Sequence, residues 1–163
     1  ASRVPVEAIT LLLGIIALIF GTNWWVQRLR GHPEKPPYRA SDATGLFWGT
    51  LTGITSFIAH AGAPPAQVYL MPLRLPPLVF AGTMTFIFAG LNLVKLLPYT
   101  ALGLFTRETL IASAILFPIA VLSMLAGVEL VKRLPVARFY PIIYGLLILM
   151  GLRLIWTGVA GLL

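Results

Sequence analysis

The sequence contains no cysteine and very little charge. Without cysteine, the chain can form neither a disulfide nor a thiolate metal site, and the redox compartment stays open. Lysine and arginine together number 12 and aspartate and glutamate 5, so that 10% of the 163 residues are charged. An average soluble domain is roughly 25% charged. This shortage argues against a soluble globular protein.

Hydrophobic residues make up 58% of the chain, with 15 glycines and 13 prolines among the remainder. Glycine and proline are both more frequent in transmembrane helices than in soluble ones, so they do not indicate disorder here. The net charge is +7. Because the charges are so few, we interpret them by position, as a guide to topology, and expect no nucleic-acid partner.

Charge is absent from long stretches of the chain, including 9–26, 44–73, 75–94 and 109–128, and 139–163 holds one charged residue, Arg153. A bilayer core needs about 20 apolar residues per helix, and backbone that meets lipid must be helical. The sequence therefore predicts an all-α polytopic membrane protein. Its five expected membrane segments are 6–26, 45–71, 79–99, 109–131 and 140–162.

The linker 28–43 is basic and rich in proline, and the positive-inside rule places it in the cytoplasm. If all five segments crossed once, the basic cluster at 132–138 would lie outside, against the same rule. If 45–71 instead enters and returns on one side, eight basic residues lie inside and two lie in outside loops. The inside residues are then Arg28, Arg30, Lys35, Arg39, Arg74, Lys132, Arg133 and Arg138, and the outside ones are Arg3 and Arg107. The charges favour a broken or re-entrant segment.

Residues 60–65, His-Ala-Gly-Ala-Pro-Pro, provide a place for this break. Gly62 is expected to end one half-helix in the left-handed conformation, and Pro64 or Pro65 to open the next. Non-helical backbone at membrane depth is tolerated only within protein or beside water. We therefore expect the break to face a cavity. A proline kink in an ordinary span is the alternative.

Two short apolar stretches, 14–21 and 145–151, both begin and end with glycine. Under the re-entrant topology they cross the membrane in opposite senses, as the last helices of two inverted repeats do. We therefore expect 44–163 to form a second transmembrane repeat and 1–27 to be the last helix of a preceding repeat. Because the chain begins with Ala1 directly before a span, we also expect that an N-terminal portion is missing.

A half-helix that begins at the break directs its positive dipole end into it, which creates an anion site. The prolines have no N–H, so the expected free donors lie around Ala63, Ala66 and Gln67. His60 can add a hydrogen bond or a proton-dependent charge to the same anion. The competing interpretation is a neutral His60 that binds a backbone carbonyl freed by the break.

Polar residues in the apolar segments form a second set of candidates, because charged groups within a span are rare and usually functional. Asn92 and Lys95 are three residues apart on one face of segment 79–99. Lys95 can instead extend its amine to the interface. Arg153 can pair with Glu129, neutralise a bound anion, or mark the effective end of its helix.

Enzymatic patterns are weak. Ser56 and His60 are four apart and would share a helix face, but no carboxylate orients the histidine as in a catalytic triad. Two histidines without cysteine or an acidic cluster do not predict a metal site, and we expect no cofactor. An intramembrane hydrolase that uses Ser56 and His60 stays open as a remote alternative.

The stretches "GITSFIAHAGAPPAQVYLMPLRL" (53–75) and "FAGTMTFIFAGLNLVKLLPY" (80–99) resemble the second half of the TauE/SafE sulfite exporter family, also called TSUP. The resemblance covers about 44–163, and 1–26 resembles the preceding helix. The family usually has Gly-Gly before Pro-Pro, whereas this chain has Gly62 and Ala63, which narrows the backbone freedom there.

The resemblance implies one half of an inverted-repeat carrier for small anions, such as sulfite, sulfonates and other organosulfur anions, in the bacterial cytoplasmic (inner) membrane. Its implied partners are the bilayer, the anion, a missing N-terminal half of the same transporter and a second copy of the chain. A non-transporting accessory subunit is the main rival. The candidate substrate-binding residues are His60, Gly62, Ala63, Pro64, Pro65, Ala66, Gln67, Asn92 and Lys95.

Overall fold

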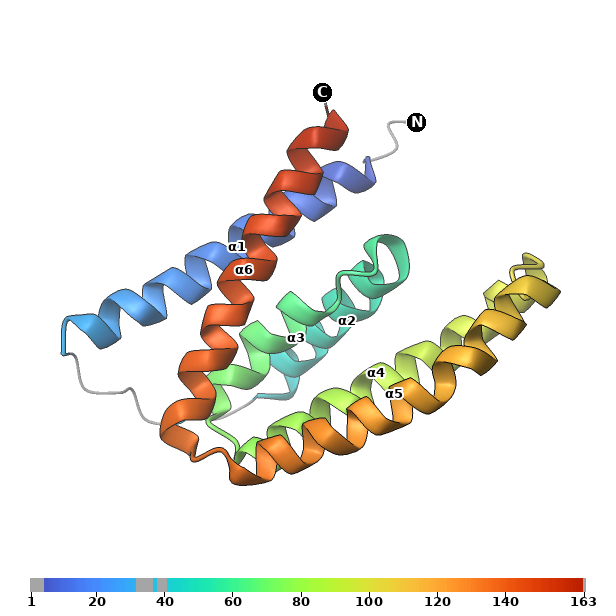
Figure 1. Ribbon diagram of the computed structural model, residues 1–163. Helices are drawn as coiled ribbons and strands as arrows, with labels where there is room; N and C mark the ends of the chain where they lie inside the picture. The colour runs from blue at the N-terminus through green and yellow to red at the C-terminus, as the bar shows by residue number, and fades with distance from the viewer. Residues whose placement is uncertain (1–4, 32–36, 38–40, 163) are drawn as a thin grey trace. The chain divides into compact units, whose positions relative to one another are not determined.

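The computed structural model describes residues 5–31, 37 and 41–162, and within these ranges the chain forms helices and no strand. The helices are α1 (Val6–Leu29), α2 (Asp42–Ala59), α3 (Ala63–Leu70), the short 3-10 helix η1 (Met71–Leu73), α4 (Pro77–Ala101), α5 (Arg107–Arg133) and α6 (Val136–Leu162) (Figure 1). The all-α prediction is confirmed. Three basic residues used in the topology argument, Arg3, Lys35 and Arg39, lie outside the described residues.

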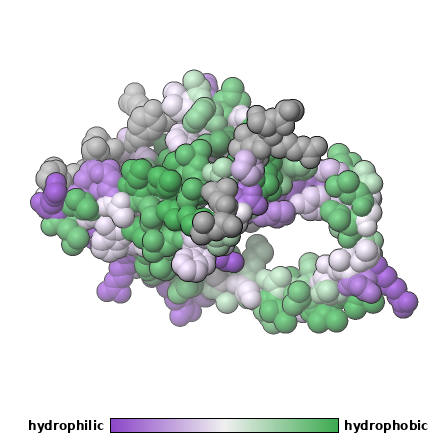
Figure 2. Space-filling model, turned by 90° about the horizontal axis from the view of Figure 1, so that it is seen from above, coloured by the Kyte–Doolittle hydropathy of each residue, from purple (hydrophilic) through white to green (hydrophobic). Residues whose placement is uncertain are grey.

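Four helices, α1, α4, α5 and α6, are long and apolar enough to cross a membrane. They coincide with four of the five predicted segments and extend slightly beyond them. Apolar side chains cover much of the molecular surface, as the green atoms of Figure 2 show. Such a surface suits helices surrounded by lipid, so the chain is an integral membrane protein.

The chain divides into two compact units. The first consists of residues 1–75 and 137–163 and therefore holds α1, α2, α3, η1 and nearly all of α6. The second consists of residues 76–136 and holds α4 and α5. The break and its surroundings belong to the first unit.

In the first unit, α1 and α6 pack antiparallel through glycines. A Cβ atom added to Gly14 would lie 2.8 Å from the carbonyl oxygen of Gly151, and one added to Gly158 would lie 2.9 Å from the backbone nitrogen of Leu11. Small residues let two membrane helices approach closely, so that dispersion contacts between backbones hold them together. Nearer the C-terminal end of α1, the rings of Trp24 and Tyr144 stack with centroids 4.3 Å apart.

The remaining predicted segment, 45–71, is a helical hairpin, because the chain reverses between α2 and α3 (Figure 1). Gly45, in the first turn of α2, lies beside Tyr69, in the last turn of α3: an added Cβ would be 2.9 Å from the Tyr69 hydroxyl oxygen. The two arms are therefore antiparallel, and the hairpin begins and ends on one side. The broken-helix prediction is confirmed, and the proline-kink alternative is wrong.

The return arm of this hairpin is short. It consists of 8 residues of α3 and 3 residues of η1. At the rises of these helix types it spans about 18 Å, less than the hydrocarbon core of about 30 Å. A chain that returned from the opposite membrane surface would need a longer arm. The return arm is thus too short to cross a bilayer, as is expected of a re-entrant segment.

The base of the hairpin is held against α6. The Tyr140 hydroxyl donates a hydrogen bond of 2.8 Å to the carbonyl oxygen of Leu75. Arg74 adopts a left-handed conformation with φ of 52°, and its guanidinium carbon lies 5.2 Å from the centre of the Tyr140 ring. Tyr140 is 1% exposed, so this contact is part of the packed interior of the first unit.

We expect Tyr140→Phe to lower the free energy of unfolding by about 1 kcal/mol, because the Leu75 carbonyl loses its donor while the aromatic ring stays. Thermal unfolding in detergent measures this change. Arg74→Gln removes only the cation above the ring and should cost less. Equal stability of wild type and Tyr140→Phe would contradict a structural role for this hydrogen bond.

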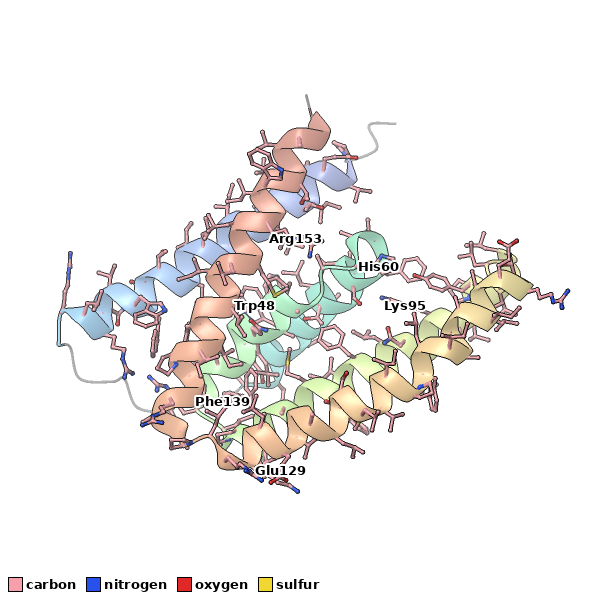
Figure 3. The ribbon with its side chains drawn as sticks, in the orientation of Figure 1. Trp48, His60, Lys95, Glu129, Phe139 and Arg153 are labelled. Carbon is pink, nitrogen blue, oxygen red and sulfur yellow. The ribbon has the colours of Figure 1, made fainter. Side chains whose placement is uncertain are left out.

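The second unit is a hairpin of two long helices joined by a short turn. Thr106 caps α5, since its hydroxyl oxygen accepts a hydrogen bond of 3.2 Å from the Thr109 backbone N–H. Gly103 provides the left-handed residue of the turn, with φ of 66°. None of the residues of α5, all of which are described, is buried within the chain. At the end of α5, Glu129 pairs with Arg133 of the same helix at 2.9 Å (Figure 3).

Candidate functional site

The left-handed residue of the break is His60, two residues before the predicted Gly62. His60 caps α2 in the left-handed conformation, with φ of 52° and ψ of 24°, and Ala61 N–H donates to the Thr55 carbonyl at 3.2 Å. Gly62, the expected left-handed residue, instead has φ of −75° and caps α3. Its carbonyl accepts from the Ala66 N–H at 3.4 Å.

Placing histidine in the left-handed region has a cost. For an L-residue other than glycine it is roughly 1–2 kcal/mol, although histidine is found there more often than most residues. Such strain persists only when the surrounding structure imposes it, and it is concentrated at functional sites. The imidazole therefore occupies a position where glycine would form the same turn at lower cost.

The α3 N-terminus is built largely as predicted. Ala63 is the first helical residue and is followed by Pro64 and Pro65, so the prolines lie in the first turn as predicted, but alanine and not proline opens the half-helix. Ala63 has a helical conformation, in which alanine is tolerated as well as glycine. The family's usual Gly-Gly is thus not required for this backbone geometry.

The predicted set of free donors at this N-terminus needs correction. Ala66 N–H already donates to the Gly62 carbonyl at 3.4 Å, and Gln67 lies one turn inside α3, where its N–H points along the helix. The first helical N–H groups have no partner within the helix, and two of these positions are prolines. The donors left at the tip are therefore those of Gly62 and Ala63.

Gln67 carries a different signal. Its side-chain oxygen Oε1 is buried and has no hydrogen-bond partner among the described residues. An unsatisfied buried acceptor costs about 1–3 kcal/mol, so it is rarely left without a partner in the working protein. The side-chain oxygen of Gln67 is therefore available to a hydrogen-bond donor such as a water molecule.

A cavity of about 480 Å³ opens at the hairpin tip within the first unit. It is lined by residues of α1, of the tip and of α6: Val6, Glu7, Thr10, Ala59, His60, Ala61, Met150, Arg153, Leu154 and Thr157. Figure 3 shows His60 at the end of α2 and Arg153 on α6. The expectation that the break faces a cavity is confirmed. The cavity combines two nitrogen donors, His60 and Arg153, with one carboxylate, Glu7.

Among the nine predicted binding residues, His60 lines this cavity. Gly62, Pro64, Pro65 and Ala66 are buried in the packing of the hairpin, and Ala63 and Gln67 are partly buried. These six residues form the hairpin next to the tip but are not among the residues that line the cavity. The assignment of all nine residues to one site stays a prediction.

Asn92 and Lys95 belong to α4, in the second unit. Lys95 is 7% exposed, whereas Asn92 is exposed. The two residues therefore have different surroundings, although they are three apart on one helix.

The geometry assumed for a hydrolase is wrong. Ser56 is 4% exposed and lies within α2, but His60 has left the helix through its left-handed turn and is exposed. The spacing of four residues therefore does not place both side chains on one helix face. Within the part of the chain that the structure describes, no group of three histidine, aspartate or glutamate residues can hold a metal ion.

The sequence singled out Arg153 but did not place it in one cavity with His60. The usable signal for Arg153 was a lone cation in a long apolar stretch. For Glu7, Thr10 and Thr157 there was no comparable signal, because contact between α1 and α6 depends on the fold.

With the site described, the chain can be compared with known proteins. The model of a family described as sulfite exporter TauE/SafE matches residues 1–154, from before α1 into α6. The chain belongs to this family. Comparison with curated proteins gives no match, and comparison with solved structures gives none.

Membership of the TauE/SafE family confirms the resemblance found in the sequence. The match extends across α1 and the linker, beyond the stretch 44–163 on which the resemblance was based. The family is one of membrane transporters for sulfur-containing anions, in agreement with four apolar helices of membrane-spanning length.

Proposed function

We propose that this TauE/SafE protein is a secondary carrier for small sulfur-containing anions, such as sulfite or sulfonates, in the bacterial cytoplasmic membrane. The observation that carries the proposal is the cavity at the re-entrant tip, where His60 and Arg153 share one space. Substrate would bind there and reach the two sides of the membrane alternately. The family membership supplies the substrate class.

Arg153 gives the site its charge. An arginine within an apolar membrane helix is costly unless a counter-charge or water compensates it. A bound anion supplies that compensation, and the planar guanidinium matches the oxygens of a sulfite or sulfonate group in a two-point hydrogen bond. Arg153 is exposed to the cavity rather than packed in the helix contact, so an incoming anion can reach it.

The hairpin contributes hydrogen-bond donors to the site. The backbone donors of Gly62 and Ala63 and the positive end of α3 favour an anion at the tip. The imidazole of His60 lines the same cavity and can donate a hydrogen bond to the anion. Gln67, behind the tip, offers its side-chain oxygen to a bound water.

The proposal is tested by thermal unfolding of the purified protein in detergent against sulfite, thiosulfate, alkanesulfonates, carboxylates, phosphate and matched cations. A ligand that binds only the folded state at a hundredfold excess over Kd stabilises it by about 2.7 kcal/mol. We expect stabilisation by the sulfur-containing anions and no response to the cations.

His60→Gly and His60→Ala are a matched pair for the histidine. Both remove the imidazole, but glycine also relieves the left-handed strain, so His60→Gly should be at least as stable as wild type without ligand. Both variants should lose most of the anion-dependent stabilisation. If His60→Gly keeps it in full, the imidazole is not part of the site.

The accessory-subunit alternative gives a different pattern. A subunit that carries no substrate would show no stabilisation by any anion in a well-folded sample, and changes at the tip would alter only its stability. Counterflow of labelled sulfite in proteoliposomes decides between the two, since only a carrier exchanges labelled for unlabelled substrate.

A further inference from the structure

Two arginines of the first unit are held against aromatic groups beside α6, at the base of the hairpin. The guanidinium carbon of Arg74 lies 5.2 Å from the centre of the Tyr140 ring. That of Arg28 lies 5.2 Å from the centre of the Trp24 ring, and Trp24 in turn stacks on Tyr144. Because Tyr140 and Tyr144 are four residues apart, they share one face of α6. The aromatic groups of that face therefore support both guanidiniums.

The two arginines also lie at similar levels along the helices. Trp24 of α1 is level with Tyr144 of α6, since their rings stack. The helices are antiparallel, so one turn forward along α1 reaches Arg28, while one turn back along α6 reaches Tyr140. Tyr140 is the residue whose ring supports Arg74. Both cations therefore belong to one end of the first unit.

The backbone at Arg74 favours the same position for its side chain. Arg74 caps η1 in the left-handed region, with φ of 52° and ψ of 41°, where glycine would be less strained. The next residue, Leu75, is fixed by the hydrogen bond that its carbonyl accepts from Tyr140. Strain of this kind persists only where the surrounding structure imposes it. Packing against α6 thus holds a guanidinium at a turn where glycine would be expected.

Negative charge is scarce around this pair. Among the described residues of the first unit, the acidic ones are Glu7 and Asp42. Glu7 lies in the first turn of α1, at the opposite end from Arg28. Asp42 is exposed in the first turn of α2, where it complements the helix dipole. Arg28, Arg30 and Arg74 thus leave this end of the unit with an excess of positive charge.

The surroundings of these arginines match a lipid headgroup. Tryptophan and tyrosine concentrate at the depth of the headgroups, and basic residues concentrate at the cytoplasmic surface. Basic sites between membrane helices at that surface bind anionic headgroups. A guanidinium has five N–H donors in one plane. Contact of its face with a ring is therefore compatible with paired hydrogen bonds from its edge to phosphate oxygens.

We propose that Arg28 and Arg74, with the rings that support them, form a binding site for the phosphate headgroup of an anionic phospholipid. The residues of this lipid site are separate from those that line the cavity at the hairpin tip. Lipid binding here does not depend on the proposed transport function. A bound headgroup contacts both α1 and the base of the hairpin, and therefore stabilises the first unit.

The test compares phosphatidylglycerol with phosphatidylcholine of the same acyl chains. Both have a phosphodiester, but the choline cation neutralises the second. Native mass spectrometry of the purified protein in a neutral detergent gives the Kd of each bound lipid, and thermal unfolding gives the stabilisation. Glycerol 3-phosphate, which has no acyl chain, tests whether a soluble phosphate occupies the site.

Arg28→Gln and Arg74→Gln each remove one cation of the lipid site. Arg138→Gln is the matched control, because Arg138 is an exposed arginine of α6 in the same unit. It precedes Tyr140 by two residues, which turns its side chain about 200° around the helix and away from the face of Tyr140 and Tyr144.

For wild type and Arg138→Gln, we expect phosphatidylglycerol to bind at least tenfold more tightly than phosphatidylcholine and to raise the unfolding temperature. Arg28→Gln and Arg74→Gln should each raise the Kd of phosphatidylglycerol by about fivefold, which is typical of one basic residue at a membrane surface. Neither should change the Kd of phosphatidylcholine by more than about twofold. Without lipid, both should unfold near the wild-type temperature.

Three outcomes would overturn the lipid site. The first is equal binding of the two lipids by wild type. The second is an effect of Arg138→Gln as large as those of Arg28→Gln and Arg74→Gln, because diffuse positive charge would then explain the binding. The third is displacement of phosphatidylglycerol by an equal concentration of glycerol 3-phosphate, which would make a soluble phosphate the ligand. None of these outcomes bears on sulfite binding at the hairpin tip.

Discussion

Arg153→Gln is expected to abolish the stabilisation of the protein by sulfite and sulfonates and to reduce their transport to background. The guanidinium lines the cavity and can form a two-point contact with an oxyanion. Charge-assisted hydrogen bonds contribute about 1.5–3 kcal/mol each. Loss of a two-point contact should therefore raise the Kd by about tenfold to a hundredfold or more.

Folding should survive this change, because removal of a cation from an apolar helix lowers the cost of burying that helix in lipid. The unfolding temperature without ligand should therefore be unchanged or higher. Arg153→Lys keeps the charge but not the planar geometry and should retain part of the binding. Arg107→Gln, at the exposed start of α5, controls for net charge. Full anion binding by Arg153→Gln would place the site elsewhere.

Gly151→Leu should be the most destabilising single substitution in the first unit. A Cβ atom at Gly151 would lie 3.0 Å from the Gly14 carbonyl oxygen and 3.1 Å from the Leu18 backbone nitrogen. Backbone atoms of a helix cannot move aside as a side chain can. The two helices must therefore separate, which costs typically 1–3 kcal/mol or more in a close-packed contact.

Gly145→Leu is the control on the same helix, since nothing lies within 4 Å of a Cβ atom added there. We expect Gly145→Leu to unfold at nearly the wild-type temperature in detergent and Gly151→Leu to unfold well below it. Separation of α1 from α6 should also open the cavity and weaken anion binding. If both variants unfold at the same temperature, the glycine contact between α1 and α6 does not stabilise the first unit.

The helices themselves follow from local sequence. Long uncharged stretches require helical backbone in lipid, which is why 79–99 and 109–131 were found nearly to their ends as α4 and α5. The re-entrant hairpin was also predictable, because the distribution of basic residues and the coincidence of Gly62 with Pro64 and Pro65 pointed to the same segment. Both arguments depend on composition and on short-range backbone chemistry.

Details of the break were less predictable. Gly62 was the obvious residue for the left-handed turn, but the structure uses His60. His60 is the residue at which α2 ends, and Gly62 caps α3 by accepting from the Ala66 N–H. Local preference favoured glycine, but the left-handed residue is the one directly after α2.

The sequence by itself determined that this is a helical membrane protein of the TauE/SafE type with a re-entrant hairpin, because lipid leaves the backbone so few options. Only the tertiary structure decided what the hairpin tip faces. It packs α1 antiparallel to α6 through Gly14 and Gly151, and so brings Glu7 into the cavity with His60 and Arg153. These residues are far apart in the chain, and no periodicity links them. Their meeting depends on which helix faces are small enough to touch, and that is a property of packing rather than of local sequence.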